Sequence, residues 1–278
     1  MDKQEQYIEL YKSLGLMEST EREKGFPLHQ RCEKAEKCWS QAQERRPNES
    51  DYRNSIYAPY LGANYEKTRL FIVAENMNEY GGWNAIDGLV KGAIKEISDG
   101  RSRVRFGNDW KNYRGSYLWH RLGAYGIAFA ERLGIVKDLH WQPNGFPSLS
   151  EVCNGFAYLA YTNHVKCSPK GSRSKPTGEM WENCGRRILR REIELADPSF
   201  ILVLGTSSNR WAFENHIFST MIPSPGAGTA SFGKALIGEK KVNYIVLPHP
   251  SFFRISPSRV IGDFKRAITE LLNDKWPG

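Results

Sequence analysis

The sequence predicts a three-layer α/β domain with a central, mainly parallel sheet of four strands. Four short apolar runs each have the length of a strand that is buried on both faces. Longer stretches with the apolar spacing of helices lie between these runs. Because strands that alternate with helices form parallel βαβ units, we expect helices on both faces of the sheet.

The elements are expected in a regular order along the chain. The four strands are predicted at Leu70–Ala74, Phe156–Thr162, Phe200–Gly205 and Tyr244–Pro248. The helices are predicted at Gln4–Gly15, Trp83–Ile97, Ser116–Leu133, Gly178–Ala196, Ser207–Phe218 and Pro257–Leu272. Thr177 is the expected N-cap of the fourth helix. We therefore divide the chain into a helical, cysteine-bearing segment (1–60) and an α/β domain (61–278).

The composition excludes several classes of protein. A hydrophobic content of 40% with 12% aromatic residues argues against a wholly disordered chain. No apolar run is long enough to cross a bilayer, and residues 1–20 lack the pattern of a signal peptide, so we expect a cytoplasmic protein. We also expect a monomer. The net charge of +8 is typical of proteins that bind a polyanion, but it does not specify one.

The cysteines lack the tight CxxC spacing of a zinc ribbon, and their odd number, five, argues against a complete disulfide framework. Five residues separate Cys32 from Cys38, and sixteen separate Cys167 from Cys184. In a reducing compartment they are thiols or metal ligands, and spacing alone leaves both interpretations open. Cys153 lies in an apolar segment and is expected to be a buried thiol.

Polar residues follow each of the four predicted strands. These residues are Glu75 and Asn76, then Asn163, then Thr206 to Ser208, and finally His249 to Ser251. Ligands of parallel sheets bind beyond the carboxyl ends of the strands. The four polar turns therefore predict a single site at one edge of the sheet.

One family matches these motifs in their order. The run Thr162-Asn163-His164-Val165-Lys166-Cys167, followed by Ser172-Arg173, Pro176-Thr177, Glu179 and Cys184, resembles the iron–sulphur class of uracil-DNA glycosylases. His249-Pro250-Ser251 continues the resemblance. It implies that Cys32, Cys38, Cys167 and Cys184 bind a structural 4Fe–4S cluster, although the family spaces its first pair as CxxC. A zinc site is the alternative.

The resemblance also implies catalytic roles for the residues at the strand ends. Asn76 would orient the attacking water, and Glu75 would contact the base or assist that water. Asn163 would read the edge of a flipped pyrimidine, because its amide both donates and accepts hydrogen bonds. His249 would donate a hydrogen bond to the departing base anion. The first motif departs from the family at Ala74, Met77 and Asn78, and a turn that caps the next helix is the alternative interpretation.

Further residues are candidates for contact with DNA. Asn78 would line the base pocket, and Tyr80, Tyr113 or Tyr117 would stack on the base. The remaining candidates would contact the backbone or enter the base stack: Lys166, Arg173, Ser251, Phe252, Phe253 and Arg254. A core position is the alternative for the two phenylalanines.

The substrate prediction rests on pocket size. The 86 residues between Asn76 and Asn163 are more than compact family members have, and Asn78 is smaller than the tyrosine of the uracil-selective members. We therefore consider both uracil excision in repair and excision of an enlarged pyrimidine, such as glucosylated hydroxymethylcytosine in phage DNA, as a defence function. A non-catalytic DNA-binding module is the third hypothesis, but the polar strand-end residues favour an enzyme.

Overall fold

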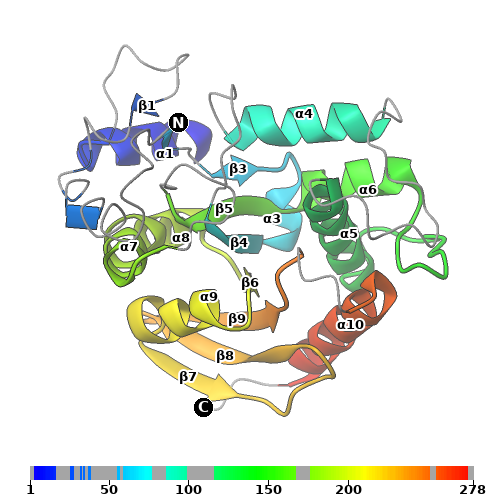
Figure 1. The fold of residues 1–278 in the computed structure, drawn as a ribbon. Helices are drawn as coiled ribbons and strands as arrows, with labels where there is room; N and C mark the ends of the chain where they lie inside the picture. Colours follow the sequence, from blue (N-terminus) through cyan, green and yellow to red (C-terminus); the bar gives the residue numbers. More distant parts are fainter. Residues whose placement is uncertain are drawn as a thin grey trace.

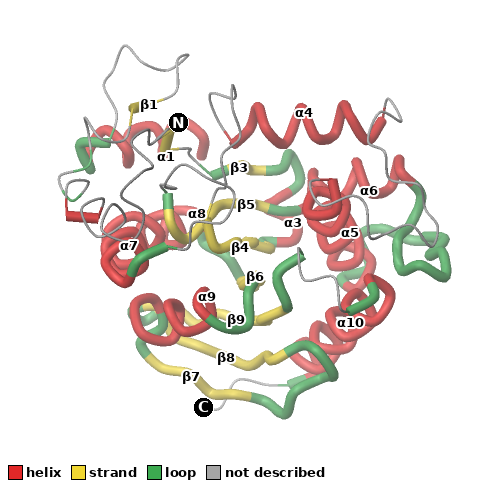
Figure 2. The backbone as a smooth tube through the Cα atoms, in the orientation of Figure 1, coloured by secondary structure: helices red, strands yellow, loops and turns green. Residues whose placement is uncertain are grey.

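The fold is seen in a computed structural model, which describes residues 3–16, 26–27, 32, 34, 37–38, 55–56, 59–76, 86–98, 116–166, 176–250 and 255–274. A two-stranded sheet pairs β1 (Phe26–Pro27) with β2 (Ser55–Ile56). All other described strands belong to one large sheet with helices on both faces (Figures 1 and 2). The predicted three-layer α/β/α architecture is therefore confirmed.

The large sheet has seven strands in the order β3-β5-β4-β6-β9-β8-β7. These are β3 (Tyr60–Leu61), β4 (Leu70–Asn76), β5 (Ala160–Val165), β6 (Phe200–Leu204), β7 (Thr220–Pro223), β8 (Ser231–Ile237) and β9 (Lys240–Leu247). β4, β5, β6 and β9 run parallel, and they correspond to the four predicted strands. β3, β7 and β8 extend the sheet by antiparallel pairing, so the predicted count of four was too low.

The missed and shifted strands have local explanations. β8 contains a buried lysine, Lys234, whose Nζ lies 2.7 Å from an Asp274 carboxylate oxygen, and a charge inside a strand hides its apolar pattern. The second predicted strand began too early, at Phe156, because Phe156–Tyr158 form a 3₁₀ turn. Phe156 is buried in that turn, as it would be in a strand, so its apolar character does not distinguish the two conformations.

Two layers of helices cover the sheet (Figure 1). One face carries α1 (Lys3–Ser13), α7 (Gly178–Cys184), α8 (Arg190–Ala196) and α9 (Ser208–Ala212). The other face carries α4 (Ile86–Ser98), α5 (Ser116–Arg132), α6 (Leu149–Gly155) and α10 (Pro257–Asn273). The short α3 (Tyr65–Thr68) precedes β4. No helix among the described residues is both long and apolar enough to span a membrane.

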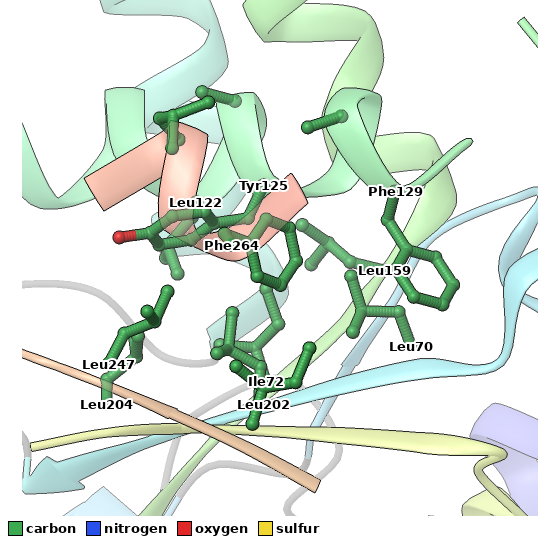
Figure 3. Close-up of a cluster of buried hydrophobic side chains, with 14 of the residues drawn as sticks. Leu70, Ile72, Leu122, Tyr125, Phe129, Leu159, Leu202, Leu204, Leu247 and Phe264 are labelled. Carbon is green, nitrogen blue, oxygen red and sulfur yellow. The ribbon is translucent and has the colours of Figure 1, made fainter. Parts of the chain in front are cut away.

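The larger apolar core lies between the sheet and the layer of α5 and α10. Figure 3 shows Leu122, Tyr125 and Phe129 of α5 packed with Phe264 of α10 over the sheet. The sheet contributes Leu70, Ile72, Leu202, Leu204 and Leu247, all of them fully buried. Removal of this apolar surface from water fixes α5 against the parallel strands.

The prediction of one helix over 178–196 is correct in extent. α7 continues through a π-helical turn, Gly185–Leu189, into α8. Thr177 caps its start, since its Oγ1 accepts a 3.2 Å hydrogen bond from the Met180 backbone N–H. A Cβ on Gly185 would lie 2.7 Å from His164 Nε2, so the glycine allows the helix to approach β5 closely.

Candidate active site

The carboxyl ends of β5, β4, β6 and β9 lie side by side, as the parallel register requires. Ala74 pairs with Asn163, Val73 with Val203, and Leu204 with Leu247. The Gly205 N–H donates a 2.8 Å hydrogen bond to the Leu247 carbonyl just beyond the last of these pairs. The polar residues after the four strands therefore share one edge of the sheet, as predicted.

Asn209, which the sequence did not single out, holds this edge together. The Asn209 Nδ2 donates to the Val73 carbonyl at 3.1 Å and to the Leu204 carbonyl at 3.0 Å, so one amide links β4 to β6. Its Oδ1 lies 3.1 Å from His164 Nδ1, which extends the link to β5. The signal for Asn209 was weak, because an asparagine in the first turn of a helix is commonly an exposed capping residue.

Glu75 lies against the start of α9. A Cβ built on Gly205 would be 2.6 Å from Glu75 Oε1 and 3.2 Å from Asn209 Cβ. The φ angle of Gly205 is +124°, a backbone conformation that residues with a Cβ rarely adopt. Glycine at this position therefore leaves the space that the half-buried Glu75 carboxylate occupies.

Asn163 lies on the opposite face of the sheet from Glu75. The Tyr161 hydroxyl donates a 3.3 Å hydrogen bond to Asn163 Oδ1, and the Tyr161 ring packs edge-on against Trp119 of α5. The Asn163 side chain is 2% exposed. Asn163 therefore belongs to the α5 side of the edge, while Glu75 belongs to the α9 side.

His249 follows β9 and is held in its neutral form. Burial, assisted by the positive charge of Arg121, lowers the pKa of His249 to about 4. Arg121 is a fully buried residue of α5, and its Nη2 donates a 3.3 Å hydrogen bond to the Ile255 carbonyl. A neutral imidazole carries one N–H that can donate to an anion. The sequence did not predict a role for Arg121, because an arginine within a mostly apolar helix is usually assigned to the solvent-exposed face.

Lys166 was expected to contact the DNA backbone, and the structure corrects this. Its side chain is 2% exposed, and its Nζ lies 2.5 Å from Glu192 Oε2. Nζ also donates to Thr162 Oγ1 at 2.6 Å. An ammonium buried in this way is satisfied inside the protein and cannot reach a phosphate.

Several predicted residues lie outside the described part of the chain. They are Asn78, Tyr80, Tyr113, Cys167, Arg173, Ser251, Phe252, Phe253 and Arg254. Asn76 is the last residue of β4 and Tyr117 is in the first turn of α5, but their side chains are outside the described part as well. The roles predicted for all these residues remain predictions.

Three of the four predicted cluster ligands lie on the α1 side of the sheet. Cys38 and Cys184 are buried in one apolar cluster, and Cys32 packs against it. Burial, together with the charges of Cys184 and Cys32, raises the pKa of Cys38 to about 11. A hydrogen bond from Asn183 acts in the opposite direction and lowers this pKa. In contrast, Cys153 packs against the core on the other face, where its Sγ donates to the Ile94 carbonyl at 3.7 Å.

Two side chains approach cysteine sulphurs on this side of the sheet, where the iron–sulphur cluster is predicted. Asn183 Nδ2 donates to Cys38 Sγ at 3.5 Å, and Arg187 Nη1 lies 4.0 Å from Cys32 Sγ. Donors to sulphur and an all-cysteine ligand set are features of such centres. Within the described residues, no three His, Cys, Asp or Glu side chains are arranged to hold a metal ion. Cys167, the fourth predicted ligand, is not among those residues.

The fold and the polar edge define a three-layer α/β protein with polar residues gathered at the carboxyl ends of its parallel strands. Residues 111–274 match the uracil DNA glycosylase superfamily, and the chain belongs to this superfamily. Members of the superfamily are DNA glycosylases, which are hydrolases that act on DNA. The match includes Asn163 and His249 but begins after Glu75 and Asn76. No curated protein matches the chain.

Proposed function

We propose that the protein is a monofunctional DNA glycosylase that hydrolyses the N-glycosidic bond of a flipped pyrimidine. The observation that carries this proposal is the neutral, largely buried His249 at the carboxyl edge of the sheet, on the α5 side where Asn163 also lies. A neutral donor and an amide on the same side of the edge suit the departure of a base anion. Membership of the superfamily supports the same reaction class.

In this proposal, residues from both faces of the sheet take part in the reaction. Asn163 binds the edge of the extruded base, and His249 donates a hydrogen bond to the anion that forms as the C1′–N bond breaks. The electron pair of that bond leaves with the base. A water oriented by Asn76, and assisted by Glu75 from the α9 side, adds its oxygen to C1′ and loses one proton. The products are a free base and an abasic sugar.

The substrate is either uracil or an enlarged 5-modified pyrimidine. The long connection from β4 to β5, which contains α4, α5 and α6, favours a site larger than uracil needs. Glucosylated hydroxymethylcytosine is an example of this second class of substrate. With such a substrate the protein would act in defence against phage rather than in repair.

One assay separates these candidates. The protein is incubated with oligonucleotides that carry uracil, a thymine mismatch or a bulky 5-modified cytosine, and abasic sites are detected by alkaline strand cleavage. We expect release from at least one substrate, and a loss of about 100-fold or more in rate for His249→Ala. His140→Ala, at an exposed histidine, is the matched control and should retain the wild-type rate.

The possible outcomes discriminate among the hypotheses. Release of uracil alone supports the repair enzyme, and release of the modified cytosine alone supports the defence enzyme. DNA binding without release from any substrate would overturn the glycosylase proposal in favour of a binding module. An active His249→Ala variant would overturn the role of His249.

We also propose that a 4Fe–4S cluster is held by Cys32, Cys38, Cys167 and Cys184. The soft all-sulphur donor set and the donors from Asn183 and Arg187 support this proposal. When bound, the cluster supplies structural cross-linking between the N-terminal segment and the domain, since base hydrolysis transfers no electron. Zinc is the alternative occupant.

A further inference from the structure

A buried polar network joins the N-terminal helix to the base-reading strand. Glu192 of α8 is fully buried, and its Oε2 accepts hydrogen bonds from Lys166 Nζ at 2.5 Å and from Thr162 Oγ1 at 3.2 Å. Its other oxygen, Oε1, accepts a hydrogen bond from the Tyr11 hydroxyl. The Tyr7 hydroxyl donates to the Glu192 backbone carbonyl at 2.9 Å. One residue of α8 thus connects α1 with β5.

The contacts come from Thr162, within β5, and from Lys166, which directly follows it. Thr162 and Lys166 are four residues apart and both side chains bond to the same carboxylate oxygen. The Lys166 Nζ also donates to Thr162 Oγ1 at 2.6 Å, which closes a three-member ring of hydrogen bonds. Asn163 lies between these two residues and points to the opposite face of the strand, because side chains alternate along a strand. The network therefore fixes the backbone from which Asn163 projects.

The charges in the network belong to the same region as the cysteines. Lys166 directly precedes Cys167 in the sequence. An ion pair with 2% and 0% exposed side chains is costly to desolvate, and such pairs are weak evidence of a contribution to stability. A positioning role accounts for these charges better than a stabilising one.

We infer that Thr162, Lys166 and Glu192 are positioning residues that hold the carboxyl end of β5, and with it Asn163, against α1 and α8. This inference rests on the proposed function, in which Asn163 reads the base. Misplacement of a reading group by a fraction of an ångström slows the chemical step more than it weakens DNA binding, because backbone contacts supply most of the affinity.

Thr162 provides the sharpest test, since two small substitutions separate its hydroxyl from its methyl group. Thr162→Val keeps the shape and removes the hydrogen bonds, whereas Thr162→Ser keeps the hydroxyl and removes a methyl. If the network positions Asn163, kcat falls about tenfold in Thr162→Val with KM for DNA nearly unchanged, and Thr162→Ser stays within about threefold of wild type. If the residue only fills space, Thr162→Ser is the worse variant, and that result would overturn the inference.

The ion pair is tested by neutralising both partners together. Lys166→Met alone leaves an uncompensated buried carboxylate, so the Tm should fall by about 10 °C. Lys166→Met with Glu192→Gln should recover most of this Tm, yet remain about tenfold slower in kcat, because Met donates no hydrogen bond. Recovery of both Tm and kcat would overturn the inference. Arg190→Met with Glu194→Gln removes an exposed pair on the same helix and is the matched control.

Hydrogen exchange distinguishes failure of this inference from failure of the proposed function. Amide exchange in residues 160–166 and 3–13 should be faster in Thr162→Val than in Thr162→Ser, whatever the substrate is. If the wild type releases no base, the proposed function fails and the exchange comparison still decides whether the network holds β5. Equal exchange in both variants would show that it does not.

Discussion

Single residues at the sheet edge owe their chemistry to burial. His249 would titrate near pH 6.5 if exposed, but desolvation and the Arg121 charge lower its pKa to about 4. The folded protein therefore keeps this ring neutral throughout the physiological range. Neutrality is what the proposed role requires, since the ring can then donate one hydrogen bond while the developing negative charge stays on the base.

The depressed pKa of His249 predicts a pH-dependent stability. Between pH 4 and pH 6.5 the unfolded chain binds a proton at His249 that the folded chain does not, so the free energy of unfolding falls as the solution is acidified through this range. When the pH is lowered from 7 to 4.5, the free energy of unfolding of the wild type should fall by at least about 1 kcal/mol more than that of His249→Gln. Urea unfolding at the two pH values measures this difference. His140→Gln, at an exposed position, should follow the wild-type curve. Parallel curves for all three proteins would contradict the prediction.

At the scale of elements, the turns between strands and helices arrange the site. The turn after β6 brings Asn209 back over β4, where its amide bonds the carbonyls of both strands. Gly205 makes this possible, because only glycine readily adopts its φ of +124°. The same turn leaves the space in which Glu75 lies.

Gly205→Ala should therefore disturb both the turn and Glu75. The new Cβ would lie 2.6 Å from Glu75 Oε1, and the backbone would be strained in addition. We expect a loss of about 1–3 kcal/mol in the free energy of unfolding and a fall in excision rate. Gly178→Ala is the control, since nothing lies within 4 Å of a Cβ at that position. Equal stability of the two variants would show that the turn tolerates a side chain.

At the scale of the whole molecule, the two helical layers have different tasks. The α5–α10 layer carries the larger core and the side of the edge that bears Asn163 and His249. The opposite layer carries α1, the buried Glu192 network and the cysteines. The N-terminal helix is thus tied to the domain by polar contacts and, in our proposal, by a cluster.

The cluster proposal predicts a specific behaviour of Cys184→Ser. Wild-type protein purified without oxygen should be brown and contain about four iron and four sulphide per chain. Cys184→Ser should lose most of this iron and expose α1 to protease, because the link to the N-terminal segment is lost. Cys153→Ser, on the other face of the sheet, should retain both properties. Colourless wild-type protein with stoichiometric zinc would overturn the proposal.

Much of this architecture was predictable from local sequence. The four parallel strands are short apolar runs. β6 is buried along its whole length, which is the environment that an uninterrupted apolar run predicts. Helix periodicity predicted α5, the helix from α7 to α8, and α10 to within a few residues. β8 was missed because the ion pair of Lys234 with Asp274 joins residues 40 positions apart, which no local pattern records.

The sequence by itself determined the fold class, the polar edge of the sheet and the superfamily to which the chain belongs, because burial periodicity and short motifs are local properties of the sequence. Only the tertiary structure decided what individual polar residues do. The sequence next to Lys166 would be the same whether its ammonium bound a phosphate or Glu192. The packing of α8 on β5 buries the side chain and so selects Glu192. The same holds for Asn209 and Arg121, whose partners come from distant parts of the chain. Charge and hydrogen-bonding capacity are properties of a residue, but their use depends on which groups the fold brings within about 3 Å.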